Sequence, residues 1–211
     1  MVRALLAGTK SQTRRALRPQ PAAGEVPSLS AHGNPFGQPG DRLWVRETYA
    51  AFGHWEMRRD VRKARDAWYF IDETKAAGLA YRYDYADADV TGTRRAGVAP
   101  AWHKRPALFM PRAASRILLE ILDVRVERLQ AVSPADAVAE GIARMGEAYA
   151  LIGSDAPTDD PVLAYRSVWE SINGTGSWDA DSWVWVVGFC PLLPAVAALE
   201  RRTIVCPPTV R

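Results

Sequence analysis

The chain has 211 residues, 48% of them hydrophobic and 24% charged, which is typical of an ordinary globular protein with one substantial core and excludes a disordered chain. The net charge is +3, and the absence of a signal-peptide core or a bilayer-length apolar run predicts a cytoplasmic protein without membrane partners. Two cysteines are too few for a disulfide framework, and three histidines without HxxxH or CxxC spacing argue against a metal site.

Predicted elements in the first half of the chain are separated by long irregular segments. Residues 2 to 7 fit the end of a helix, and the Pro, Gly and Ser content of residues 19 to 40 predicts a loop. Residues 43 to 48 alternate apolar and polar side chains and are predicted to form a strand. Residues 50 to 100 mix charges, tyrosines and glycine-marked turns, and we interpret them as an insertion whose elements we do not assign.

The second half of the chain alternates strand and helix signals. Both predicted helices begin with a capping residue followed by proline at the first helical position. The predicted elements are a strand over residues 116 to 129 that bends near Asp123, a short helix from Ser133 to Gly141, a helix from Asp160 to Asn173 and a buried strand over residues 183 to 189. The Pro-rich tail over residues 190 to 211 is expected to be peripheral.

Positive charge is concentrated in two blocks that contain no acid. Residues 1 to 20 hold Arg3, Lys10, Arg14, Arg15 and Arg18, and the stretch between Asp89 and Glu120 holds Arg94, Arg95, Lys104, Arg105, Arg112 and Arg116. If the two blocks meet in space they form a face that attracts phosphate. The alternative is that they are separate solvated loops.

The segment from Gly8 to Arg15 combines a candidate base, hydroxyl groups and two guanidinium groups. Lys10 and Thr13 are three residues apart, so on a helical or tight-turn path their side chains share a face. A threonine hydroxyl needs a neighbouring base to become a nucleophile, and the charges of Arg14 and Arg15 would help Lys10 to lose its proton. The alternative is that Gly8 ends a helix and the cations after it bind phosphate.

Six sequence blocks occur in an order that resembles the ASCH domain, specifically its phage and prophage subgroup. The blocks are GTKSQTRR, GDRLWVRET, MPRAASRILLEILDVRVERLQ, DAVAEGI, WESINGTGSW and WVWVVGF, and the resemblance covers residues 1 to 48 and 102 to 189. It implies an α+β fold built on a PUA-like (ASCH) β-barrel with short flanking helices. It further implies a single domain over residues 1 to 189 with one large insertion at about 50 to 100, followed by the tail over residues 190 to 211.

The family includes RNA-binding modules, a reported ribonuclease type and bacterial amidohydrolases that remove the acetyl group from N4-acetylcytidine. The amidohydrolase motif Gly-x-Lys-x-x-Thr-x-Arg is matched by Gly8, Lys10, Thr13 and Arg15. The resemblance implies that Thr13 is the nucleophile and Lys10 its activator. It also implies that Glu140, in the DAVAEGI block, assists the leaving amine, and that neither a metal nor another cofactor is needed.

Five further residues are candidate substrate contacts that could hold a phosphate or a base edge. Arg46 and Glu47 are expected at the end of the first strand, and Arg112, Ser115 and Arg116 at the start of the next. The leading function is hydrolysis of an N4-acylated cytosine nucleoside or a related modified base, either free or within RNA. The alternatives are a nucleic-acid-binding module without catalysis and, less favoured, a ribonuclease, since no histidine pair divides acid and base roles.

A strand precedes the first helix in similar proteins of this subgroup, and no such strand precedes residues 2 to 7 here. A barrel edge would then stay open, with backbone groups that lack partners. We expect this edge either to be buried in a homodimer or to be covered by residues 203 to 206 of the tail, which have enough β-branched character to form a strand.

Overall fold

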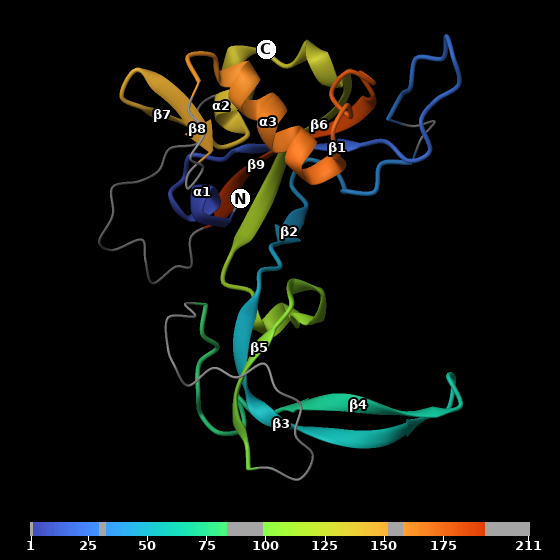
Figure 1. Cartoon of the computed structure of the whole chain (residues 1–211), viewed down its shortest axis with the longest axis vertical. Helices are drawn as coiled ribbons and strands as arrows, with labels where there is room; N and C mark the ends of the chain where they lie inside the picture. Colours follow the sequence, from blue (N-terminus) through green and yellow to red (C-terminus); the bar gives the residue numbers. More distant parts are fainter. Residues whose placement is uncertain (1, 30–32, 84–98, 152–157, 193–211) are drawn as a thin grey trace. The chain divides into compact units, whose positions relative to one another are not determined.

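The computed structural model describes residues 2–29, 33–83, 99–151 and 158–192, and it confirms a mixed α+β protein with many strands and few helices (Figure 1). The helices are α1 (Val2–Leu6), α2 (Pro134–Ala139) and α3 (Pro161–Asn173), with 3-10 turns η1 (Ala107–Phe109), η2 (Arg112–Ala114) and η3 (Leu129–Ala131). The strands are β1 (Gln12–Ala16), β2 (Arg42–Trp44), β3 (Tyr49–Asp60), β4 (Arg65–Asp72), β5 (Ala101–Arg105), β6 (Leu118–Arg128), β7 (Ile142–Met145), β8 (Ala148–Leu151) and β9 (Trp183–Leu192). No helix in these ranges is long and apolar enough to cross a membrane.

The chain divides into two compact units. Unit 1 comprises Met1–Leu43 and Ile117–Arg211, and unit 2 comprises Trp44–Arg116. Unit 2 contains residues 50 to 100, which the sequence indicates are an insertion, and unit 2 extends beyond this segment at both ends. The predicted tail strand over residues 203 to 206 lies outside the described residues, as do Arg94 and Arg95 of the second basic block.

A four-stranded sheet with the order β1-β9-β6-β2 is the framework of unit 1, and it curls like half of a barrel (Figure 1). The pairs β1/β9 and β6/β9 are antiparallel. Strand β9 is central, and its residues from Val184 to Val187 are all buried, which explains the apolar run in the sequence. The bend predicted near Asp123 is confirmed, because the register of β6 shifts between Ile121 and Asp123.

The two predicted helices of unit 1 are confirmed, together with the residues that cap them. Ser133 and Asp136 form a reciprocal capping box at the start of α2, and the Asp160 carboxylate accepts from the Val162 N–H at the start of α3. Gly174 follows the last residue of α3 at φ +99°. Each helix is therefore positioned by a local signal that is independent of the core.

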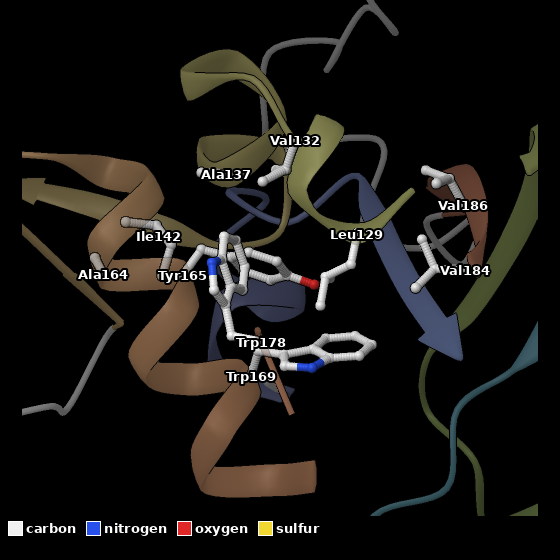
Figure 2. Packing of buried hydrophobic residues seen from close by; sticks show 10 residues of the cluster. All are labelled: Leu129, Val132, Ala137, Ile142, Ala164, Tyr165, Trp169, Trp178, Val184 and Val186. Carbon is white, nitrogen blue, oxygen red and sulfur yellow. The ribbon is translucent and has the colours of Figure 1, made fainter. Parts of the chain in front are cut away.

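A core of aromatic and branched side chains holds the helices of unit 1 against the sheet. Figure 2 shows the rings of Tyr165 and Trp169 from α3 next to Trp178, with Ile142 and Ala137 on the α2 side. The Tyr165 and Trp178 rings meet edge to face with centroids 6.2 Å apart. Tyr165 and Trp169 of α3 are therefore buried in the core of unit 1.

Unit 2 is built on a three-stranded sheet with the order β4-β3-β5, in which β3 pairs antiparallel with both neighbours. Its buried cluster comprises Tyr49, Ala51, Met110 and Ala114. The Tyr49 hydroxyl donates to the carbonyl of Phe109 at 2.9 Å, so the buried ring keeps its polar atom satisfied. Unit 2 thus has a core of its own.

Two predicted boundaries are wrong. The strand expected over residues 43 to 48 is Arg42–Trp44, because the next backbone groups bind side chains instead of a neighbouring strand. The Val45 carbonyl accepts from the Ser115 hydroxyl at 2.9 Å, and the Glu47 N–H lies 3.3 Å from a methionine sulfur. At the other end, β9 continues to Leu192, so the first residues assigned to the tail pair with β6.

Candidate functional site

A cavity of about 110 Å³ in unit 1 lies between the β1 segment, the end of α2 and one side of α3. Four of the candidate residues line it, namely Lys10, Thr13, Arg15 and Glu140. Arg14, which was expected only to help Lys10 lose its proton through its charge, lines it as well. Residues 130 positions apart in the chain are thus brought to one cavity, as in the pair Lys10 and Glu140.

Lys10 is held in place by two tight turns. Gly8 adopts φ +71°, a conformation that favours glycine, and the chain after it folds back so that the Lys10 N–H donates to the Ala4 carbonyl at 3.2 Å. Gly141, at φ +99°, follows Glu140, and a Cβ there would lie 3.0 Å from the Ala4 Cβ and 3.3 Å from the Lys10 Cβ. The close approach of these two turns delivers the lysine to the glutamate.

Lys10 and Glu140 form a buried ion pair. The Lys10 Nζ donates to the Glu140 Oε2 at 2.8 Å and to the Glu140 backbone oxygen at 2.7 Å, with 3% and 7% of the two residues exposed. Burial lowers the pKa of Lys10 and raises the pKa of Glu140, because a low-dielectric site disfavours both charged forms. The positive charges of Arg15 and Arg14 lower the Lys10 pKa further. The two pKa values are therefore closer together than in an exposed pair, and the proton is shared more equally between the Lys10 amine and the Glu140 carboxylate.

Thr13 lies on an extended segment and not on a helical turn. In a strand, successive side chains point to opposite sides, and burial alternates accordingly, with Lys10, Gln12 and Arg14 buried and Ser11 exposed. The three-residue spacing therefore does not put Lys10 and Thr13 on one face, although both line the cavity. In the described part of the chain the Thr13 hydroxyl makes no hydrogen bond with Lys10.

Arg14 is wholly enclosed and binds three carboxylates. Its guanidinium nitrogens lie 3.1 Å from the Glu127 Oε2, 3.4 Å from the Asp136 Oδ2 and 3.4 Å from the Glu140 Oε1. Glu140 is therefore held between two cations, Lys10 on one oxygen and Arg14 on the other. Sequence reasoning missed this role, and the signal that could have found it is the alternation of buried residues along a strand, which a helical interpretation hides.

The wall opposite β1 is formed by apolar residues of α3, namely Tyr165, Val168, Trp169 and Ile172. Tyr165 and Trp169 also belong to the core. Tyr165 and Trp169 are buried, whereas Ile172 is 57% exposed at the mouth. Two residues of the lining, Trp169 and Arg14, carry buried N–H donors, Nε1 and Nε respectively, without a hydrogen-bond partner in the described residues. Such donors destabilise the folded state, because no hydrogen bond replaces those that they make with water in the unfolded chain.

Gly8 is not part of the cavity lining, and the remaining five candidate residues belong to unit 2. Glu47 and Arg116 form a bidentate pair with both N···O distances at 2.9 Å, and the Ser115 hydroxyl donates to a backbone oxygen. The Arg46 guanidinium lies 4.7 Å from a tryptophan ring centroid, and Arg112 is exposed at the start of η2. The expectation that Arg46 and Glu47 end one strand, and that Arg112, Ser115 and Arg116 begin the next, is wrong, since β2 ends at Trp44 and β6 begins at Leu118.

The residues that line the cavity supply amino, hydroxyl, carboxyl and guanidinium groups beside an aromatic wall. Across residues 2–29, 33–83, 99–151 and 158–192, no group of three or more His, Cys, Asp or Glu side chains is arranged to hold a metal ion. Comparisons of the chain with protein-family models, curated proteins and solved structures gave no match. The function therefore has to be argued from the site itself.

Proposed function

We propose that this chain is an ASCH-type, PUA-like amidohydrolase that removes the acyl group from an N4-acylated cytosine nucleoside or a related modified base. The observation that carries the proposal is the buried Lys10–Glu140 pair in a cavity that Thr13 also lines. Buried titratable pairs with opposed pKa shifts are characteristic of acid–base sites. The block order and the Gly-x-Lys-x-x-Thr-x-Arg motif support the same assignment.

Lys10 acts as the general base in this mechanism. A neutral amine has two N–H donors and one lone pair, and the two oxygens of Glu140 within reach of Nζ match the two donors. The lone pair is then left for the Thr13 proton, once the acyl group brings the hydroxyl and the amine together. Burial favours this state because it lowers the Lys10 pKa.

The reaction proceeds through an acyl-threonine ester. The Thr13 oxygen attacks the acyl carbon while its proton passes to Lys10, and the C–N bond then breaks as the leaving amine takes a proton from Glu140. The raised pKa of Glu140 favours the protonated carboxyl that this step needs. Water then cleaves the ester, which releases the carboxylic acid and returns the Thr13 hydroxyl, and the proton on Lys10 passes to Glu140 so that the pair regains its starting state. Backbone N–H groups near Gly8 to Lys10 are proposed donors to the oxyanion.

The aromatic part of the lining, formed by Tyr165 and Trp169, suits a flat heterocycle such as cytosine. The cations of this segment are less suited to phosphate, because Lys10 and Arg14 are buried against carboxylates. This disfavours the alternative in which the segment only grips nucleic acid.

The test is hydrolysis of a panel of N4-acyl cytidines, with labelled RNA incubated in parallel. Thr13→Ser should retain part of the activity, whereas Thr13→Val and Lys10→Met should each lose on the order of 100-fold or more. The double variant should be little worse than either single one, since residues that act as a unit are non-additive. The exposed neighbour Ser11 provides the control, and Ser11→Ala should behave as wild type.

Two outcomes would contradict the proposal. The first is a folded protein that leaves every acyl cytidine unchanged. The second is a pair of modest, additive losses in Thr13→Val and Lys10→Met, because such losses indicate independent structural roles.

A further inference from the structure

Unit 2 contains a hollow of about 550 Å³ that is unusually rich in aromatic rings. Five aromatic residues line it: Trp55 from β3, Trp68, Tyr69 and Phe70 from β4, and Phe109 from the η1 turn. Phe109 is 58% exposed and Tyr69 39% exposed. Rings exposed beside a hollow are more typical of a binding surface than of a surface that faces only water.

A buried arginine fixes the arrangement of these rings. The Arg105 guanidinium carbon lies 4.7 Å from the ring centroid of Trp55, 4.4 Å from that of Phe70 and 5.2 Å from that of Phe109. Cation–π contacts of this kind hold both the charge and the ring faces in place. The exposed ring of Phe109 is therefore presented by a supported cluster, and a flat ligand that stacks on it meets a preorganised surface.

The charges around the hollow are mainly positive. Three cations line it, Lys63, Lys104 and Arg105, against one carboxylate, Asp60. Asp60 already pairs with Lys63 at 3.5 Å. The hollow thus combines aromatic side chains with lysine and arginine side chains, which suits a ligand that has both flat rings and negative charge.

We propose that this hollow of unit 2 binds single-stranded polynucleotide, with a base stacked on Phe109 and the adjacent phosphates near Lys104 and Lys63. Stacking on aromatic side chains together with phosphate neutralisation is the usual basis of sequence-tolerant single-strand binding. An acidic peptide would match the charge but leave the rings without a stacking partner. The inference rests on residues of unit 2 and does not depend on the proposed hydrolysis.

The test is fluorescence anisotropy of the full-length protein with a labelled 12-nucleotide oligouridylate or oligothymidylate, and binding of either supports the proposal. Phe109→Ala should raise the Kd about tenfold through the loss of one stacked base, while Phe109→Trp should not. The adjacent Leu108 is 72% exposed and outside the hollow, so Leu108→Ala is the matched control and should keep the wild-type Kd.

Charge is tested in the same assay as a function of salt. The wild-type affinity should fall as salt rises, and Lys104→Gln should weaken binding and reduce the salt slope by about one. Arg62→Gln removes an exposed charge outside the hollow and should leave both unchanged. Thr13→Val should bind the oligonucleotide as wild type does, so failure of this inference and failure of the hydrolase proposal are separable.

Two results would overturn the inference. One is an equal Kd for Phe109→Ala and Leu108→Ala, with thermal melts that show both variants folded. If Phe109→Ala does not fold, Tyr69→Ala takes its place, and an unchanged Kd in that variant counts in the same way. The other is competition by a polyglutamate peptide as strong as that by the unlabelled oligonucleotide, which would reduce the hollow to a non-specific charged patch.

Discussion

The Lys10 amino group is subject to opposing influences. The Glu140 carboxylate favours its charged form, whereas burial and the charges of Arg15 and Arg14 disfavour it. Burial is the largest of these effects, and the pKa of Lys10 is lowered as a result. A lysine in this position needs less alkaline conditions to act as a base than a lysine in water does.

The pH profile of hydrolysis should report this lysine. The reaction needs a neutral Lys10 and a protonated Glu140, so kcat/KM should rise with pH as Lys10 loses its proton and fall again once Glu140 is ionised. Arg15→Gln removes a positive charge that lowers the Lys10 pKa, so the rising limb should move to higher pH and the rate below the limb should fall. Arg18→Gln makes the same change at an exposed site that does not affect Lys10, and its profile should match that of wild type. Coincident profiles for all three proteins would exclude Lys10 as the base.

The buried pair should also be visible in stability. Glu140→Leu leaves the Lys10 ammonium buried without its carboxylate and should lower the free energy of unfolding by about 3 kcal/mol. Adding Lys10→Met removes that stranded charge, so the double variant should recover at least half of the loss. Urea unfolding at one pH measures both. A double variant destabilised by the sum of the single changes would show that the two side chains do not interact.

At the residue scale, the sequence predicted part of the site. Lys10, Thr13, Arg15 and Glu140 were selected from the motif and a distant block, and they line one cavity. The ion pairs of Arg14 with Glu127 and Asp136 were not predicted, because these partners come from β6 and α2 and no local pattern in the sequence joins them to Arg14.

At the scale of elements, helix ends were the most predictable feature. Capping is a contact within three or four residues, so Ser133, Asp160 and Gly174 mark the boundaries of α2 and α3 directly. The strand expected over residues 43 to 48 was predicted too long. It ends early because the Val45 carbonyl accepts a hydrogen bond from Ser115, which is far away in the sequence. Long-range hydrogen bonds of this kind leave no periodic signal.

Substitutions at Gly141 and Gly174, which lie just after α2 and α3, distinguish the cost of backbone strain from the cost of crowding a neighbour. Gly141 and Gly174 both have φ +99°, but a Cβ on Gly141 would lie 3.3 Å from that of Lys10, whereas nothing lies within 4 Å of one on Gly174. Gly174 has ψ 155°, so Gly174→Ala should cost about 1–3 kcal/mol for this extended backbone at positive φ alone. Gly141→Ala should cost more, and thermal unfolding measures the difference. Equal costs would show that the contact with Lys10 relaxes freely.

At the scale of the whole molecule, the chain leaves and rejoins unit 1 on neighbouring strands. The Ile121 N–H donates to the Asp41 carbonyl at 2.9 Å, and the Gly40 N–H donates to the Ile121 carbonyl at 2.8 Å. Paired strands lie about 4.8 Å apart, so the break points before Trp44 and after Arg116 are within reach of a short linker.

Replacing residues 44–116 by a four-residue Gly-Ser linker should therefore leave unit 1 folded. All the residues that line the cavity of unit 1 remain, so a free acyl nucleoside should still be hydrolysed within about tenfold of the wild-type rate. A single cooperative melt and the hydrolysis assay are the measurements. A folded but inactive product would show that unit 2 contributes to the reaction, and Thr13→Val in the shortened chain controls for background.

The enclosure of Arg14 also bears on how this sequence can diverge over evolutionary time. One guanidinium with no exposed side-chain surface serves acids from β6 and from both ends of α2. A lineage that loses the arginine alone leaves three carboxylates to two cations, with Glu140 on Lys10 and with Glu127 and Asp136 on Arg125. One that loses an acid alone keeps an under-compensated buried cation. Paired changes that restore the balance of charge are therefore favoured. In any set of divergent relatives, position 14 should therefore covary with positions 127, 136 and 140.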